Sequence, residues 1–144
     1  MNGDIRTGTW RYAVDTARWA LPGHDTRYRA QTMEVVARGT EKLWIRTHHV
    51  YGDGSERSWV FDGAFDGRPY PTVWEDDGSV MTTIAFHLVT DLMAADAYEM
   101  PSAGGTPVRG AEFVLLGEDR TEAHGCLTVG GKQYPYWEEW HRAG

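Results

Sequence analysis

Residues 42–62 read KLWIRTHHVYGDGSERSWVFD, and this stretch decides the fold class. Leu43, Ile45 and Thr47 share one face of an extended chain, because side chains alternate along a strand. Asp53-Gly54 supplies the positive φ that a tight hairpin needs. The stretch therefore predicts two antiparallel strands joined by a short turn.

The same pattern repeats along the chain at intervals of roughly 11–14 residues, which is typical of a hairpin meander. The expected turns are Gly39, Asp53-Gly54, Asp66-Gly67, Asp77-Gly78, Gly104-Gly105, Gly117-Glu118-Asp119 and Gly130-Gly131. The clearest strands between them are 42–51, 56–62, 79–88, 106–116 and 132–142, all rich in β-branched and aromatic residues. We expect nine or ten short strands in a single domain over residues 1–144.

Two segments are candidates for short helical turns. Residues 15–20 precede Leu21-Pro22-Gly23, and residues 91–100 fit a helix or a strand of small residues equally well. An all-antiparallel sheet of this size must hide its edges in a barrel or a sandwich. Evenly spaced local hairpins favour an all-β, up-and-down barrel of about 8–10 strands.

Composition excludes several classes of protein. The net charge is −7 and the pI is about 5.3, which argues against nucleic acid and anionic membranes as partners. No apolar run reaches membrane-spanning length, and MNGDIRTGTW shows no secretory signal, so we expect a cytoplasmic protein. Residues 1–72 carry 10 basic and 9 acidic side chains, whereas residues 73–144 carry 4 and 12. We interpret this acidity as solvated faces.

Three motifs resemble the small bacterial lipocalin-like (calycin-type) barrels. Gly8-Thr9-Trp10 matches the Gly-x-Trp motif of their first strand, and residues 65–71 (FDGRPYP) match an internal segment of the family. Trp140 and Arg142 stand where the last strand of the family closes. Residues 116–121 (LGEDRT) depart from the family's usual late turn, S-x-D-G-(K/R)-T, since the glycine after the aspartate is missing. The resemblance implies a closed barrel around a cavity that holds a small apolar molecule.

Aromatic residues are the strongest indication of a binding site. They make up 12% of the chain, and a ligand cavity is usually lined by aromatic side chains with a few polar groups. The same residues also suit a filled core, and Trp10 fits the closed base of a barrel better than a ligand contact. The candidate ligand-binding residues are Trp10, Trp59, Phe61, Phe86, Tyr134 and Trp140.

Glu138, His49 and Tyr136 are the candidate catalytic residues. Alternation places Glu138 on the same strand face as Tyr136, opposite to Glu139, and places His49 on the face of Leu43. Burial raises the pKa of an unpaired carboxyl, which can make it a general acid or base. A solvated Glu138 and a structural His49 remain open alternatives.

Metal and cofactor chemistry have no sequence support. The six histidines lack ligand spacing, and the single cysteine, Cys126, can form neither an internal disulfide nor a thiolate zinc site. No nucleotide-binding motif and no nucleophile elbow is present. We therefore expect neither a metal nor a cofactor.

Two functions are predicted from these features. The first is a barrel that binds a small apolar or aromatic molecule. The second is a cofactor-free enzyme, such as a cyclase, isomerase or dehydratase of a secondary-metabolite type substrate, using acid–base groups inside the barrel. An interaction domain with a filled core is a third reading. The sequence leaves open whether the chain is an enzyme and whether it forms a homodimer.

Overall fold

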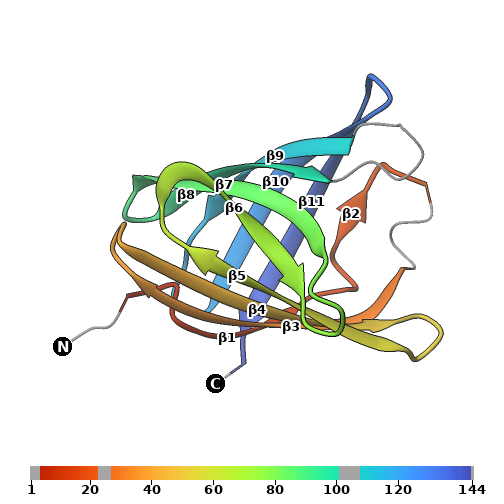
Figure 1. Cartoon of the computed structure of the whole chain (residues 1–144), viewed down its shortest axis with the longest axis horizontal. Helices are drawn as coiled ribbons and strands as arrows, with labels where there is room; N and C mark the ends of the chain where they lie inside the picture. The colour runs from red at the N-terminus through yellow and green to blue at the C-terminus, as the bar shows by residue number, and fades with distance from the viewer. Residues whose placement is uncertain (1–3, 23–26, 101–107, 144) are drawn as a thin grey trace.

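The computed structural model describes residues 4–22, 27–100 and 108–143 (Figure 1). Within them, one antiparallel sheet contains eleven strands. The strands are β1 (Gly8–Tyr12), β2 (Arg18–Trp19), β3 (Tyr28–Arg38), β4 (Lys42–Tyr51), β5 (Glu56–Gly63), β6 (Asp66–Trp74), β7 (Val80–Thr90), β8 (Met93–Met100), β9 (Val108–Leu115), β10 (Arg120–Val129) and β11 (Lys132–Arg142).

The sheet closes on itself because β1 pairs with both β3 and β11. From β3 to β11 each strand pairs with the next one in the sequence, so ten strands form an up-and-down barrel. The two-residue β2 is not part of this ring and adds to the side of β11. The predicted all-β, closed antiparallel barrel is confirmed.

Neither candidate segment is helical, so the helical alternative is wrong, and the strand alternative for residues 91–100 is confirmed. The described residues contain no helix, and residues 15–20 form a turn followed by β2. Residues 91–100 form a turn and β8, which pairs with β7 on one side and β9 on the other. Six residues are too few for a stable helix, and in the longer segment pairing on both sides satisfies the backbone along β8. The described part of the chain has no helix of the length and apolarity needed to cross a membrane.

Most of the expected turns occur at the ends of strands. Gly54 and Gly78 have φ angles of 87° and 73°, and each follows an aspartate whose carboxylate accepts a bond from a backbone N–H two residues on. Asp66-Gly67 does not separate two strands, because residues 64 and 65 connect β5 to β6 and Asp66 begins β6, although Gly67 has a φ of 79° and the Asp66 carboxylate accepts a bond from the Arg68 N–H. Gly104-Gly105 lies outside the described residues.

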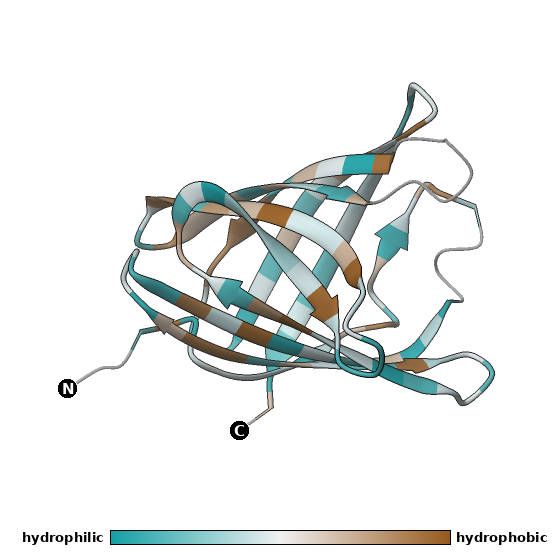
Figure 2. Cartoon of the chain, viewed as in Figure 1, coloured by the Kyte–Doolittle hydropathy of each residue, from teal (hydrophilic) through white to brown (hydrophobic). Residues whose placement is uncertain are grey.

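Hydrophilic and hydrophobic residues alternate along the strands, as Figure 2 shows. In β4 the inward side chains of Leu43, Ile45, Thr47 and His49 are all buried. One end of the barrel is filled by Trp10, which is 2% exposed and lies under the guanidinium of Arg142, 4.3 Å from the ring centre. This packing supports the structural reading of Trp10, and space remains inside the barrel above it.

Candidate functional site

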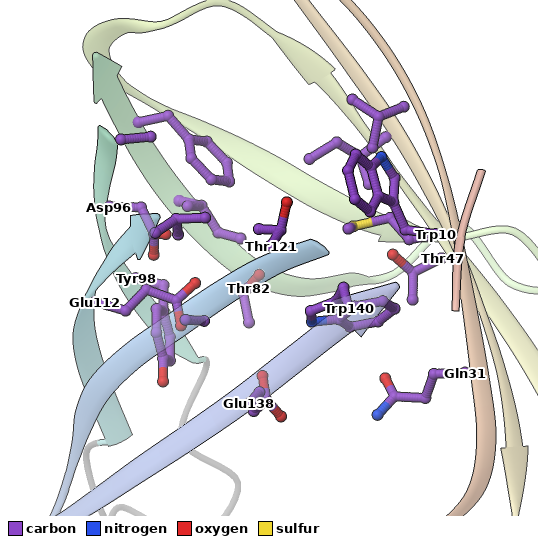
Figure 3. Close-up of a pocket in the computed structure, with 18 of the residues that line it drawn as sticks. Trp10, Gln31, Thr47, Thr82, Asp96, Tyr98, Glu112, Thr121, Glu138 and Trp140 are labelled. Atoms are coloured by element: carbon purple, nitrogen blue, oxygen red, sulfur yellow. The ribbon is translucent and has the colours of Figure 1, made fainter. Parts of the chain in front are cut away.

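The barrel contains a cavity of about 290 Å³ with two chemically different walls. The first, the apolar wall, is formed by the inward residues Met33, Val35, Leu43, Ile45, Thr47, His49 and Trp59 of β3, β4 and β5. The second, the carboxyl wall, is formed by Asp96, Tyr98, Glu112, Tyr136 and Glu138 of β8, β9 and β11. Figure 3 shows Asp96, Tyr98 and Glu112 together on one side of the cavity, Thr47 and Gln31 on the other, and Glu138 between them.

Strand register brings the carboxyl wall together. Asp96 pairs with Glu112, Glu112 pairs with Gly125, and Gly125 pairs with Tyr136. Tyr136 in turn pairs with Trp19 of β2, and their rings stack with centres 3.9 Å apart. Directly paired residues in neighbouring strands point to the same face of the sheet. A single row across five strands therefore holds two carboxyl groups, a phenol and an indole.

Two glycines let the tyrosines of this wall lie flat against the sheet. A Cβ on Gly110 would lie 2.3 Å from Cζ of Tyr98, and a Cβ on Gly125 would lie 2.3 Å from Cζ of Tyr136. No side chain could occupy either position without displacing a ring. Because Gly110 and Gly125 belong to the neighbouring strands β9 and β10, the two phenol groups converge above Glu112.

The convergent phenols form a directed chain of hydrogen bonds. The hydroxyl of Tyr136 donates to Oε2 of Glu112, so the bond of 3.0 Å between the two phenols is donated by Tyr98. Burial, followed by the charge of Glu112, raises the pKa of Tyr136, and burial also raises the pKa of Tyr98. Both phenols therefore stay protonated and act as donors at neutral pH.

Asp96 shares this environment. It is 5% exposed, and burial together with the charge of Glu112 and a hydrogen bond between the two carboxyl groups holds its pKa well above the usual range. Like charges at this proximity cannot both ionise easily, so the pair retains a proton, and the direction of the shift places it on Asp96. Oδ2 of Asp96 has no hydrogen-bond partner.

Glu138 faces the same cavity, as alternation predicted, although the cavity leaves its side chain only half-buried. Nε1 of Trp19 donates to Oε2 of Glu138 over 3.1 Å, and Tyr12 also hydrogen-bonds to it. These bonds stabilise the charged form, but burial and the charge of Glu112 outweigh them and raise the pKa of Glu138 to about 7. Glu138 therefore exchanges its proton near neutral pH. Glu139 points away and pairs with Arg120 over 2.9 Å.

His49 lies on the opposite wall. It is 4% exposed, and neither ring nitrogen has a hydrogen-bond partner. Burial, together with the positive charge of Arg27, lowers the pKa of His49 to about 4, so the ring is neutral at pH 7. Its nearest ring neighbour is Tyr28, with centres 5.0 Å apart. The structure thus brings Glu138 and Tyr136 together through Trp19 and leaves His49 on the apolar wall.

Unpartnered polar atoms gather at this cavity. Among the described residues, six buried side-chain nitrogen or oxygen atoms lack a hydrogen bond, and every one belongs to a residue that lines it. They are Nη1 of Arg6, Oγ1 of Thr47, both ring nitrogens of His49, Nε1 of Trp59 and Oδ2 of Asp96. An unpaired buried polar group costs about 1–3 kcal/mol, so such groups are rare away from sites that water or a ligand completes.

The candidate ligand-binding residues divide into two groups. Trp10, Trp59, Phe86 and Trp140 line the cavity. Phe61 and Tyr134 are not among the residues that line it. Phe61 is fully buried behind the cavity surface and packs edge-on against Phe86, with ring centres 5.1 Å apart. Tyr134 lies beside Leu127, beyond the row that holds Tyr136.

Sequence reasoning missed Asp96, Glu112, Tyr98 and Trp19. The signal was present in the charge asymmetry, because Asp96, Glu112 and Glu138 all belong to the acidic second half. Our interpretation of that acidity as solvated faces is wrong for these three residues, which line the cavity. Alternation over Ala94, Asp96 and Tyr98 would have shown the shared face once residues 91–100 were taken as a strand.

No group of three or more His, Cys, Asp or Glu side chains within residues 4–22, 27–100 and 108–143 is arranged to hold a metal ion. No protein-family model, no curated protein and no solved structure matches this chain. The fold and the geometry of the cavity are therefore the basis of the functional argument.

Proposed function

We propose that the barrel binds a small apolar or aromatic molecule in its interior. The observation that carries the proposal is the cavity of about 290 Å³ whose lining residues hold all the unpartnered buried polar atoms of the described chain. Apolar and aromatic side chains with a few polar groups are the usual composition of a small-molecule site. A ligand that satisfies those atoms would recover free energy that the empty cavity forgoes.

The proposal includes a lipocalin-like character of the barrel. It is supported by the first-strand Trp10, which packs at one end of the barrel beneath Arg142 of the last strand. Its indole Nε1 donates to the carbonyl of Arg6 over 3.0 Å, which ties the segment before β1 across this end. The cytoplasmic location and the homodimer stay predictions.

A thermal-shift screen tests the binding proposal. A panel of small apolar and aromatic compounds is added to the purified protein, and melting temperature and tryptophan fluorescence are recorded. A ligand at 100 times its Kd stabilises the folded state by about 2.7 kcal/mol, which corresponds to a rise of roughly 5–10 °C for a chain of this size. No rise with any member of a broad panel would favour a core filled by its own side chains.

Two alanines give matched variants for this screen. Ala123 lines the cavity and is 5% exposed, whereas Ala97 lies on the outer face of β8 and is exposed. Ala123→Leu adds volume inside the cavity and should remove the ligand-induced shift. Ala97→Leu should leave that shift unchanged. Equal shifts in the two variants would place the ligand somewhere other than the barrel interior.

A second function, a cofactor-free acid–base enzyme, is favoured by one specific observation. Glu138, with a pKa of about 7, shares the cavity with the chain Tyr98–Tyr136–Glu112, so a proton donor and a proton acceptor are both available at neutral pH. Such a site would handle a cyclisation, isomerisation or dehydration. Deuterium uptake from D₂O into a bound ligand, followed by NMR, tests it directly. Glu138→Gln should slow that uptake by about 10²–10⁴-fold while leaving the binding of an uncharged ligand largely intact.

A further inference from the structure

The carboxyl wall has more acceptors and negative charge than its own donors and cations can match. None of the ion pairs among the described residues includes Asp96, Glu112 or Glu138. The hydroxyl of Tyr136 already donates to Glu112, and the hydroxyl of Tyr98 donates to Tyr136. Buried carboxylates normally have a cationic partner or give up their charge.

One unsatisfied atom belongs to a residue of this wall that lines the cavity. It is Oδ2 of Asp96, a residue that is 5% exposed and is labelled in Figure 3. If Asp96 carries the proton shared with Glu112, that proton lies in the hydrogen bond between the two carboxyl groups. Oδ2 is then an acceptor that awaits a donor from outside the protein. Independently, His49 presents two unpartnered ring nitrogens from the opposite wall.

We propose that the molecule bound in this cavity carries a protonated amine, held by Asp96, Glu112 and Glu138, with its apolar or aromatic body against the apolar wall. An ammonium group supplies up to three hydrogen-bond donors and a positive charge, which are what this wall lacks. The rings of Trp19, Tyr98 and Tyr136 belong to the same wall, and a cation is favourably placed over the face of such a ring. This inference rests on the proposed binding function and names its ligand class.

Arg6, the cationic side chain among the lining residues of the described chain, lies away from the carboxyl wall. Arg6 forms an ion pair with Asp4 and lies over the ring of Phe65, 4.2 Å from its centre. Phe65 belongs to the core cluster with Trp10, at the filled end of the barrel. An amine at the carboxyl wall therefore keeps clear of like charge.

The pH dependence of binding involves every titratable side chain that faces the carboxyl wall. These are Tyr12 from β1, Asp96 and Tyr98 from β8, Glu112 from β9, and Tyr136 and Glu138 from β11, with Tyr28 and His49 on the strands opposite. The neighbouring positions in β7, β10 and β2 are Phe86, Ala123, Gly125 and Trp19, none of which titrates. Amine binding requires ionised carboxylates, so it should strengthen as the pH rises and should release protons from this wall.

Three probes of the same shape test the inference by titration calorimetry. They are 2-phenylethylamine, 2-phenylethanol and phenylacetate, which differ in the terminal group alone. At pH 8 the amine should bind about 10–100-fold more tightly than the alcohol, as expected for added charge-assisted hydrogen bonds, and phenylacetate should bind most weakly. Between pH 5.5 and 8 the affinity of the amine should rise by about tenfold or more, whereas that of the alcohol should change by less than about twofold.

Substitutions in the carboxyl wall test whether this wall causes the preference for the amine. Asp96→Asn and Glu112→Gln should each reduce the preference for the amine over the alcohol by about tenfold, and Glu99→Gln, at an exposed position of β8 outside the cavity, should preserve it. If a wall variant does not fold, calorimetry of the wild type in two buffers of different ionisation enthalpy still counts the protons released on amine binding.

The possible results separate this inference from the function on which it rests. Equal affinity for amine and alcohol, without proton release, overturns the inference and leaves binding of apolar molecules in place. Tighter binding of phenylacetate than of the amine overturns it as well. Failure of all three probes overturns it too, and the broader thermal-shift panel then decides the binding function separately.

Discussion

The two walls of the cavity deal with buried polar groups in opposite ways. The apolar wall leaves them isolated: Oγ1 of Thr47, Nε1 of Trp59 and both nitrogens of His49 have no partner. The carboxyl wall connects most of its polar groups, through Tyr98, Tyr136 and Glu112, into one hydrogen-bonded chain and leaves Oδ2 of Asp96 unpartnered. The isolated groups stay neutral, whereas the connected groups hold charge and exchangeable protons. Connection, rather than burial alone, is what concentrates chemistry on one side of the barrel.

Burial also shifts the pKa values of Glu138 and His49 in opposite directions. Desolvation disfavours the charged form of any group, so it raises the pKa of Glu138 to about 7 and lowers that of His49 to about 4. Glu138 therefore stabilises the fold below pH 4.5, and that contribution is lost as the pH rises through 7. His49 stabilises it above pH 6.5, and that contribution is lost as the pH falls through 4. Over much of the range the two contributions cancel.

The largest predicted effect comes from replacing either Glu138 or His49, because the pH dependence that one contributes is then no longer cancelled by the other. Each pKa differs from its ordinary value by about 2.5 units, which corresponds to roughly 3 kcal/mol of unfolding free energy. The unfolding free energy of Glu138→Gln, relative to that of the wild type, should rise by about 3 kcal/mol from pH 4.5 to pH 8. The unfolding free energy of His49→Gln, relative to that of the wild type, should fall by about as much from pH 4 to pH 7. Urea unfolding across the pH series measures both.

The double variant is the control for this prediction. Because the residues lie on opposite walls, their effects should add within about 0.5 kcal/mol, and the two opposite slopes should cancel. Slopes of the same sign in the two single variants would contradict the assignment of the shifts to burial.

The features that the sequence predicted are local ones. Residues 42–51 and 132–142 form strands with the expected bounds, because strict alternation and the flanking turns are both contained in short stretches. The inward position of Glu138 follows from its neighbours Tyr136 and Trp140 by the same alternation. Nothing beyond the strand itself was needed.

The features that it did not predict depend on register between strands. Asp96 lies beside Glu112 because β8 and β9 pair at that position, and the small residues of 91–100 give no periodic signal of their own. A glycine inside a strand usually weakens it, so Gly110 and Gly125 give no indication of a site in the sequence. In the structure each makes room for the ring of a tyrosine from a neighbouring strand. A wall assembled from the residues of three strands, β8, β9 and β11, has no signature in any one of them.

A second prediction breaks the carboxyl wall without altering a polar group. Gly125→Ala places a methyl group 2.3 Å from Cζ of Tyr136, so the ring must move away from Trp19 and its hydroxyl from Glu112. We expect a loss of about 1–3 kcal/mol in unfolding free energy and a change in the near-UV circular dichroism of the stacked pair. Cys126→Ala, the next residue on the outer side of β10, is the matched control and should change neither. An unchanged near-UV spectrum in Gly125→Ala would refute the close approach of the ring.

The smallest predicted effect concerns the apolar wall and has the opposite sign. Thr47→Val replaces a buried, unpartnered hydroxyl with a methyl group of the same shape, so the ligand-free protein should gain about 1 kcal/mol in urea unfolding. Thr72→Val is the matched control, because the Thr72 hydroxyl is 2.6 Å from that of Thr82 and accepts from the Thr82 N–H over 2.9 Å. Its loss leaves buried partners unpaired and should cost about 1–3 kcal/mol. If Thr47→Val destabilises the protein as Thr72→Val does, the Thr47 hydroxyl has a partner in solution, and the contrast between the two walls is smaller than the structure indicates.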